Sequence, residues 1–197
     1  MSSTIDSYKK SFKKYGVNPR ALKWHSEKAA KQRYAQIVAD IDFENKSILD
    51  VGCGFGDIIG FISAKTKYFN YTGMDAVGDF IKEAKRRHPK QKFIIANFLG
   101  KPTSKKFDIS IASGILNSNV KDNLNYRKKI IKKLFKSTKY ALVFNMAGSH
   151  LQPRPKKTSN VWFADSLEIT EYCFTLTSKI ILRNHYHKRD FTIVMFK

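Results

Sequence analysis

Cysteines, acidic residues and long apolar runs are all scarce in this chain of 197 residues. The two cysteines, Cys53 and Cys173, form no disulfide framework, and a zinc site requires more ligands than they supply. No apolar run approaches the roughly 20 residues of a membrane span, and the N-terminal MSSTIDSYKKSFKKYG lacks the apolar core of a secretory signal. We therefore expect a cytoplasmic protein with no membrane span.

The composition is otherwise that of one globular domain, because hydrophobic residues make up 42% of the chain and aromatic residues 13%. Such a mixture excludes wholesale disorder and low-complexity fibres. Basic residues outnumber acidic ones by 37 to 16, which gives a formal net charge of +21. One interpretation is attraction to nucleic acid or to an anionic membrane surface. We favour a compositional bias, because the excess is mostly lysine, whereas bidentate phosphate and base recognition relies on arginine.

The N-terminal part of the chain predicts two helices. Residues 5–14 have the pattern of a basic amphipathic helix that is closed by Gly16 and Pro19. Residues 26–42 predict a longer helix with Ser26 as its N-cap. Its apolar residues lie close to one face: Ala30, Tyr34, Ile37, Val38 and Ile41.

Buried strands and helices then alternate along the chain. Strands are expected at 47–53, 71–76, 92–98, 107–114 and 140–147, and helices at 57–65, 78–87 and 123–138. A long loop over 148–165 and a helix over 166–176 precede two strands, 179–186 and 190–196, which should form an antiparallel hairpin. This order predicts an α/β fold with a mostly parallel sheet and an antiparallel hairpin at its edge. Residues 1–45 would form a helical lid segment and 46–197 the ligand-binding domain, in a single domain overall.

A glycine-rich turn, Asp50-Val51-Gly52-Cys53-Gly54-Phe55-Gly56, joins the first of these strands to the next helix. Glycines at such a turn allow the backbone to turn sharply and to approach a ligand. The spacing is G-x-G-x-G rather than the G-x-G-x-x-G of dinucleotide sites, and Asp57 follows it. An acid at this helix start repels a pyrophosphate and suits a ligand that carries a positive charge.

The segment ILDVGCGFGD closely resembles the first motif of class I S-adenosylmethionine-dependent methyltransferases. The resemblance extends from about residue 15 to the C-terminus. YGVNPRALKWHSEKAAKQRY, SGILN and DFTIVMFK are similar to a subgroup of small, single-domain bacterial methyltransferases. This resemblance implies a Rossmann-like fold with a seven-stranded sheet of order 3-2-1-4-5-7-6 and helices on both faces. It also implies S-adenosylmethionine as cofactor and S-adenosylhomocysteine as product.

The resemblance also implies a set of cofactor contacts. Asp50 would meet the amino group, Asp75 the ribose hydroxyls and Ala76 the adenine, while the backbone at Gly52, Cys53 and Gly54 would approach the methionine portion. Asn97 stands where the family usually has an acid, and its side-chain oxygen can still accept a bond from adenine. Phe98 would pack either on the adenine ring or in the core. Ser113 and Gly114 would lie beside the sulfonium, and Arg33 would either pair with the methionine carboxylate or face solvent.

Candidates for the acceptor site follow the fourth and fifth predicted strands, above the carboxyl edge of the sheet. They are Asn117, Asn145 and His150, of which His150 could act as a general base or simply face solvent. Tyr15, Trp24 and His25 would belong to the lid. No metal site is expected, since His185 and His187 have no evident third ligand.

Three functions remain open. The first is methyl transfer to an oxygen or nitrogen of a small molecule, in a site that the basic 148–165 loop helps to shape. The second is methylation of RNA, with the basic helix over 127–139 tracking the phosphates; steeply salt-dependent binding would favour it. The third is a non-catalytic cofactor-binding partner protein. The chain has no G-x-x-x-x-G-K-[ST] or G-x-S-x-G motif, and SGIL replaces the N-P-P-Y-type tetrapeptide of many base-methylating enzymes.

Overall fold

The computed structural model describes residues 2–24, 26–100, 105–151 and 160–197. Its strands are β1 (Lys46–Val51), β2 (Phe69–Asp75), β3 (Lys92–Ile95), β4 (Phe107–Ser113), β5 (Thr138–Ser149), β6 (Ala164–Asp165), β7 (Ile180–Arg183) and β8 (Asp190–Phe196). Its helices are α1 (Ser2–Tyr15), the 3-10 helix η1 (Pro19–Leu22), α2 (Glu27–Ile37), α3 (Ile58–Ser63), α4 (Gly78–Arg87), α5 (Asn123–Lys136) and α6 (Ser166–Phe174).

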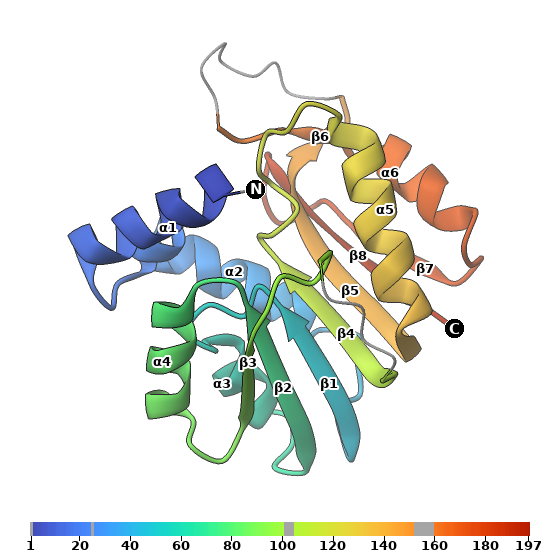
Figure 1. Cartoon of the computed structure of the whole chain (residues 1–197). Coiled ribbons are helices and arrows are strands. Elements are labelled where there is room, and N and C mark those ends of the chain that lie inside the picture. Colours follow the sequence, from blue (N-terminus) through green and yellow to red (C-terminus); the bar gives the residue numbers. More distant parts are fainter. Residues whose placement is uncertain (1, 25, 101–104, 152–159) are drawn as a thin grey trace.

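The strands form one sheet in the order β3-β2-β1-β4-β5-β8-β7, with the short β6 paired to the end of β5 (Figure 1). Strands β1 to β5 are parallel, whereas β8 is antiparallel to both β5 and β7. When the unpredicted β6 is left out and the remaining seven strands are numbered in chain order, the order of the sheet is 3-2-1-4-5-7-6. The predicted fold class and sheet order are therefore confirmed, and β6 is an addition within the expected loop.

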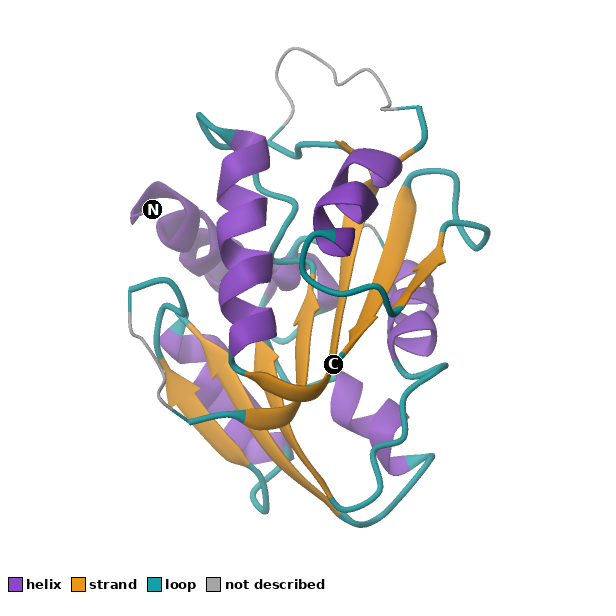
Figure 2. Cartoon of the chain, turned by 90° about the vertical axis from the view of Figure 1, so that its right-hand side faces the viewer, coloured by secondary structure: helices purple, strands orange, loops and turns teal. Residues whose placement is uncertain are grey.

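Helices cover both faces of the sheet, as Figure 2 shows. One core lies under α2, α3 and α4 and contains Ile37, Ile62 and Ile111, and the other lies under α5 and α6 and contains Ile131, Phe144 and Ile193. Both cores are built from alternating residues of the same strands, since successive strand side chains point to opposite faces. Both faces of the central strands are therefore apolar, as expected of a parallel sheet. No helix among the described residues is long and apolar enough to cross a membrane.

The helix α1 packs on the loops at one end of the sheet. Its apolar side chains Tyr8 and Phe12 contact Phe80 of α4 with ring centroids 6.0 and 5.7 Å apart, and Phe12 also meets Phe55 of the glycine-rich turn at 6.0 Å. These aromatic contacts place the N-terminal helix directly beside the turn.

The predicted helix over residues 26–42 is wrong at its end, because α2 stops at Ile37. Ser26 caps its start as predicted, with its side chain accepting a bond from the backbone N–H of Ala29. Val38 and Ile41 are buried as expected, but they lie in the connection to β1. An apolar residue at a helical spacing can be buried without being helical, and the sequence pattern did not distinguish the two cases.

Other boundaries differ by a few residues. The helix over 78–87 and the strand over 190–196 have the predicted limits. The strands predicted over 92–98 and 179–186 end earlier, at Ile95 and Arg183, and β5 begins earlier, at Thr138. After β3 the side chain of Asn97 accepts a bond from the Leu99 N–H, which starts a turn and ends the extended backbone.

Candidate cofactor and acceptor site

The glycine-rich turn between β1 and α3 has a left-handed backbone at three glycines. The φ angles of Gly52, Gly54 and Gly56 are +74°, +53° and +77°, a region that other residues rarely adopt. The backbone N–H groups of Gly52 and Cys53 donate to the Met74 carbonyl at 2.7 and 3.1 Å, which ties the turn to the end of β2. The Cys53 side chain is buried in the core, and its thiol lies 3.7 Å from the Gly54 carbonyl oxygen.

Three side chains crowd the glycines of the site. A Cβ atom at Gly52 would lie 1.9 Å from Cγ2 of Ile115, and one at Gly54 would lie 2.9 Å from Cδ2 of Leu22. Trp24, a predicted lid residue, lies over Gly114: a Cβ atom added to Gly114 would be 3.4 Å from Cη2 of Trp24. Ile115 and Leu22 were not predicted, because nothing in the sequence indicates that an apolar residue after β4 and the last residue of η1 converge on this turn. The predicted lid residue His25 lies outside the described residues.

Asp75, at the end of β2, accepts bonds from the backbone N–H groups on both sides of the site. Its Oδ2 accepts from Gly54 at 3.0 Å and its Oδ1 from Val77 at 2.9 Å. Burial raises the pKa of Asp75, and the backbone donors oppose that rise. The ring of Tyr8 lies close enough for Asp75 to raise the pKa of its hydroxyl, in addition to the larger effect of burial. Each carboxylate oxygen keeps a further acceptor position for a ligand hydroxyl.

Asp50 is a buried carboxyl group with one free oxygen. Its side chain accepts a 2.6 Å bond from the hydroxyl of Tyr71, whereas Oδ1 has no hydrogen-bond partner among the described residues. Burial raises the pKa of Asp50 to about 7, which outweighs the lowering effect of the Tyr71 bond, and nearby Asp75 raises it further. A buried acceptor without a donor costs free energy in the absence of a ligand. Asp50 is therefore suited to receive a cationic donor.

Arg33 has a protein partner that the sequence did not predict. Its Nη2 donates to both oxygens of Asp190, at 2.6 and 2.7 Å, and its guanidinium stacks on Trp24 at 4.8 Å from the ring centroid. Its Nε is buried and has no partner among the described residues. Contact of Arg33 with a methionine carboxylate stays a prediction, and it would have to use the nitrogens that Asp190 leaves.

Asp57 does not face the ligand side as a free anion. Its Oδ1 accepts a 2.8 Å bond from Arg87, which also stacks on Phe55. The positive charge of Arg87 lowers the pKa of Asp57, although burial raises it more. The expectation that Asp57 favours a cationic ligand stays a prediction, and Arg87 neutralises part of its charge. Asp50, in contrast, keeps an oxygen without a hydrogen-bond partner among the described residues.

The predicted adenine contacts lie at the carboxyl ends of β2 and β3. Ala76 follows Asp75, and Asn97 is exposed two residues beyond β3, with its side-chain oxygen engaged by the Leu99 N–H. Phe98 is only 5% exposed and packs in the core on the α5 side, with Lys133 over its ring. Of the two placements that the sequence left open for Phe98, the structure shows the core.

Ser113, Asn145 and Asn117 form a polar bridge across the ends of β4 and β5. The side chain of Asn145 donates to Ser113 Oγ at 3.1 Å and accepts from the Gly114 N–H at 3.0 Å. The side chain of Asn117 accepts from the Ala147 N–H at 2.8 Å. These contacts fix the loop after β4, so both asparagines position the site in addition to any direct part in transfer.

His150 follows the end of β5 and is half exposed. Its Nδ1 lies 3.4 Å from the carboxylate of Asp165, which also caps the start of α6 through the Leu167 N–H at 2.8 Å. The carboxylate can orient the imidazole, which is the arrangement of a histidine that acts as a base. Most of the predicted 148–165 loop, residues 152–159, lies outside the described residues.

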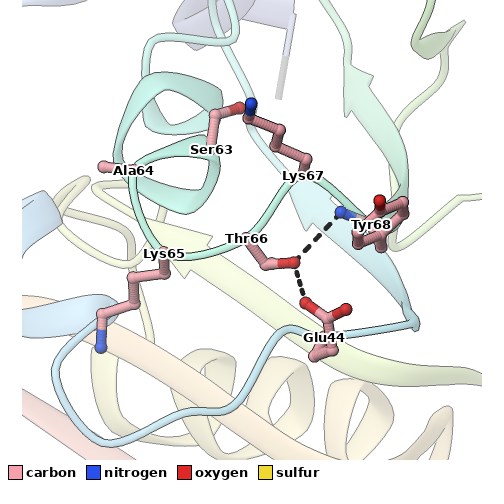
Figure 3. Close-up of a pocket in the computed structure, with 7 residues that line it drawn as sticks. All are labelled: Glu44, Ser63, Ala64, Lys65, Thr66, Lys67 and Tyr68. Carbon is pink, nitrogen blue, oxygen red and sulfur yellow. Dashed lines mark hydrogen bonds between the residues drawn. The ribbon is translucent and has the colours of Figure 1, made fainter.

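A different pocket lies at the opposite edge of the sheet (Figure 3). Glu44, Thr66 and Tyr68 are among its lining residues, and they precede the first residues of β1 and β2. Ligands of open α/β sheets bind at the carboxyl ends of the strands. The glycine-rich turn therefore marks the candidate site, and this pocket does not.

Comparison with known proteins agrees with the geometry. Residues 42–183 match a family model described as a methyltransferase domain. The chain is 26% identical over 159 residues to protein Rv1506c of Mycobacterium tuberculosis, a sequence named as a methyltransferase, covering 77% of this chain and 93% of that one. It is 34% identical to the methyltransferase-named protein 235L of Invertebrate iridescent virus 6, over 34% of this chain and 26% of the viral one.

Solved structures share the fold. The N-methyltransferase NodS of Bradyrhizobium japonicum, in complex with S-adenosylhomocysteine, has a TM-score of 0.70 at 15% identity and covers 98% of both chains. Magnesium protoporphyrin IX methyltransferase of Synechocystis, also with S-adenosylhomocysteine bound, has a TM-score of 0.67 at 14% identity and covers 100% of this chain and 95% of that one.

The chain belongs to the methyltransferase domain family, and it is a class I, S-adenosylmethionine-dependent methyltransferase. The predicted class and cofactor are thereby confirmed. The residues present fit this cofactor, because the unpaired oxygen of Asp50 suits its ammonium group and the left-handed glycines present backbone without side chains of their own.

Proposed function

We propose that this methyltransferase acts on an oxygen or nitrogen of a small-molecule acceptor bound above the ends of β4 and β5. The observation that carries the proposal is the direction of α5. The helix begins at Asn123, near the carboxyl end of β4, and ends at Lys136, just before the amino end of β5. With a rise of about 1.5 Å per residue, its last residue is roughly 20 Å from its first.

The exposed lysines of α5 consequently lie away from the candidate site. Lys129, Lys132 and Lys136 are exposed, while the apolar face of the helix packs on the sheet. Lys133 is half-buried and donates to the carbonyl oxygens of Phe98 and Leu99. A phosphate chain that followed these lysines would run along the outside of the sheet toward its amino edge, so this helix gives little support to an RNA substrate.

The acceptor side is bordered by the segment 160–162, which is hydrogen-bonded to the loop after β4. The Trp162 N–H donates to the Asn117 carbonyl and the Asn119 N–H to the Asn160 carbonyl, both at 2.9 Å. Trp24 borders the same edge at Gly114. Such a border favours a small-molecule acceptor over a polymer, and the Synechocystis enzyme of the same fold is named for a small molecule, magnesium protoporphyrin IX.

The transfer needs few groups of the chain. When bound, S-adenosylmethionine would supply the methyl group to a lone pair of the acceptor, with the bond from the methyl carbon to sulfur breaking and S-adenosylhomocysteine as the leaving group. The chain contributes by binding and orientation in a site with little water. Asp50, Asp75 and the glycine turn would hold the cofactor, and His150, with Asp165 behind it, would take the proton from a hydroxyl or ammonium acceptor.

The test is a partition of label between acceptors. The protein is incubated with S-adenosylmethionine labelled in the methyl group, together with a small-molecule cell extract or with total RNA freed of small molecules. We expect label in a small molecule, and we expect the Asp75→Ala variant to lose it. Label that enters RNA alone would overturn the proposal. No labelled product in either pool, with normal cofactor binding, would favour the non-catalytic alternative.

A further inference from the structure

Arg127 is fully buried in α5, although it stands in the basic stretch that the sequence indicated as a surface helix. Among the described residues it has no ion pair with an acid. Its donors go to oxygen atoms of the chain: Nε to the Leu116 carbonyl at 3.0 Å, Nη1 to the Asn123 carbonyl and side chain at 3.2 and 2.9 Å, and Nη2 to the Ser118 carbonyl. A buried cation is unusual without an anion, and here carbonyl dipoles surround it.

Two aromatic rings flank the same guanidinium. Trp162 and Tyr126 have their centroids 4.8 and 5.2 Å from the Arg127 Cζ, which adds cation–π attraction. Burial nevertheless lowers the pKa of Arg127 to about 10, so the group stays charged at neutral pH. The chain thus keeps a charge in its interior at this position, where a leucine or methionine would avoid the desolvation penalty.

The loop after β4 explains what the charge does. The backbone N–H groups of Asn119 and Val120 bond to the Asn160 carbonyl and the Asn123 side chain. The carbonyls of Leu116 and Ser118 turn inward, and Arg127 is a donor to both. Buried backbone oxygens need partners, and an irregular loop has no ladder to supply them.

This loop begins at the reacting end of the candidate site. Ile115 adjoins Leu116 and covers Gly52, the glycine beside the proposed methionine portion of the cofactor. Gly114 is held at the same point by Asn145. A shift of Leu116 would therefore act first on the side chain that borders the methionine portion, whereas Asp75 is held separately by the N–H groups of Gly54 and Val77.

We propose that Arg127 is a positioning residue for methyl transfer, which holds loop 115–119 through its carbonyl oxygens and thereby fixes Ile115 against the methionine portion of the cofactor. The inference rests on the proposed placement of the cofactor. It assigns to a buried member of the basic helix a part in the reaction, without contact to either substrate.

Two ligands separate this role from general stability. S-Adenosylhomocysteine keeps the amino-acid end of the cofactor, and 5′-methylthioadenosine lacks it, so only the first should respond to the loop. By calorimetry we expect Arg127→Met to weaken S-adenosylhomocysteine binding about tenfold, through loss of several charge-assisted bonds, and to change 5′-methylthioadenosine binding less than about twofold. Arg127→Lys, which keeps the charge and part of the donor set, should lie between it and the wild type.

The matched control is Lys129→Met, the same loss of one charge on an exposed position of the same helix. It should leave both affinities unchanged. If Arg127→Met does not fold, the same two affinities are measured for Arg127→Lys and Asn123→Ala. In both variants the affinity for S-adenosylhomocysteine should fall more than the affinity for 5′-methylthioadenosine.

Equal weakening of both ligands, or none, in a folded variant would overturn the positioning role. Failure of the wild type to bind either ligand would instead refute the proposed cofactor placement.

Discussion

Replacing Asp50 by asparagine should stabilise the ligand-free protein at alkaline pH while weakening cofactor binding. Asp50 is 3% exposed, and burial raises its pKa from 3.8 to about 7. The folded state therefore holds this proton more tightly than the unfolded state does. Stability falls as the pH rises from about 4 to about 7, and the full penalty is present above pH 7.

The size of the penalty follows from the shift. Three pKa units correspond to about 4 kcal/mol when the group is fully ionised in both states. At pH 5 only part of this is present, since the folded carboxyl is still protonated. The amide introduced by Asp50→Asn cannot ionise and can still accept the bond from Tyr71, although its nitrogen takes the place of an unpaired oxygen and costs about 1 to 3 kcal/mol at every pH.

The assay is urea unfolding of both proteins, without cofactor, at pH 5 and pH 8. All other titratable groups are the same in the two proteins, so the change in their difference isolates Asp50. We expect that difference to move by roughly 2 to 3 kcal/mol in favour of the Asp50→Asn variant between pH 5 and pH 8. An identical difference at both pH values would show that Asp50 is ionised throughout, and the argument from burial would fail.

The same group makes cofactor binding depend on pH. An ammonium group beside Asp50 favours the ionised carboxylate, so binding below pH 7 should release a proton and the affinity should rise with pH up to about 7. Calorimetry in two buffers of different ionisation enthalpy measures that proton. The Asp50→Asn variant should release fewer protons and should bind S-adenosylmethionine at least about tenfold more weakly.

Two further predictions concern the ribose acid and the surface charge. Asp75→Ala should weaken S-adenosylmethionine binding by about 1 to 3 kcal/mol, measured by calorimetry, and Asp75→Asn, which keeps one acceptor, should lose less; unchanged affinity in both would remove Asp75 from the site. Joint replacement of Lys129, Lys132 and Lys136 by Gln should leave the melting temperature and methyl transfer to a small molecule unchanged, because exposed charges contribute little to stability. Loss of RNA methylation in that triple variant, with a reduced salt dependence of RNA binding, would instead establish the nucleic-acid interpretation.

The order of the sheet could be predicted from the sequence because it depends on features that repeat. Each buried strand is a short apolar run, and each helix has a 3.6-residue apolar period, so the alternation survives errors of a few residues at the boundaries. The end of α2 could not be predicted, since Val38 and Ile41 keep the helical spacing after the helix has ended. Beyond the end of the helix Asp40 forms an ion pair with Arg183 of β7, 143 positions along the chain, and the local pattern gives no sign of this tertiary contact.

The candidate site was predictable where a motif is local and unpredictable where contacts are distant. The glycine turn, Asp50 and Asp75 all lie at strand ends that the pattern marks. The partner of Arg33 is 157 residues away, and nothing in the local sequence indicates that Asp190 engages it. Arg127 was hidden for the same reason, because a lysine-rich stretch gives no sign that one of its cations points inward.

Asp50 in β1 and Arg127 in α5 are both charged groups in the interior of the protein, and their surroundings differ. Each is an ionisable side chain withdrawn from water, and burial of each carries a desolvation penalty. Asp50 has an oxygen without a donor among the described residues, so its environment is incomplete until a cation arrives from outside the chain. Arg127 instead donates hydrogen bonds to backbone carbonyl oxygens of the chain itself, which would otherwise lack donors. Asp50, which lacks a donor, is therefore suited to bind a ligand, and Arg127, whose donor nitrogens all have partners in the chain, is suited to hold a loop. Substitution of Asp50 should weaken the interaction with the positive charge of the cofactor. Substitution of Arg127 should instead change the position of the cofactor's methionine end.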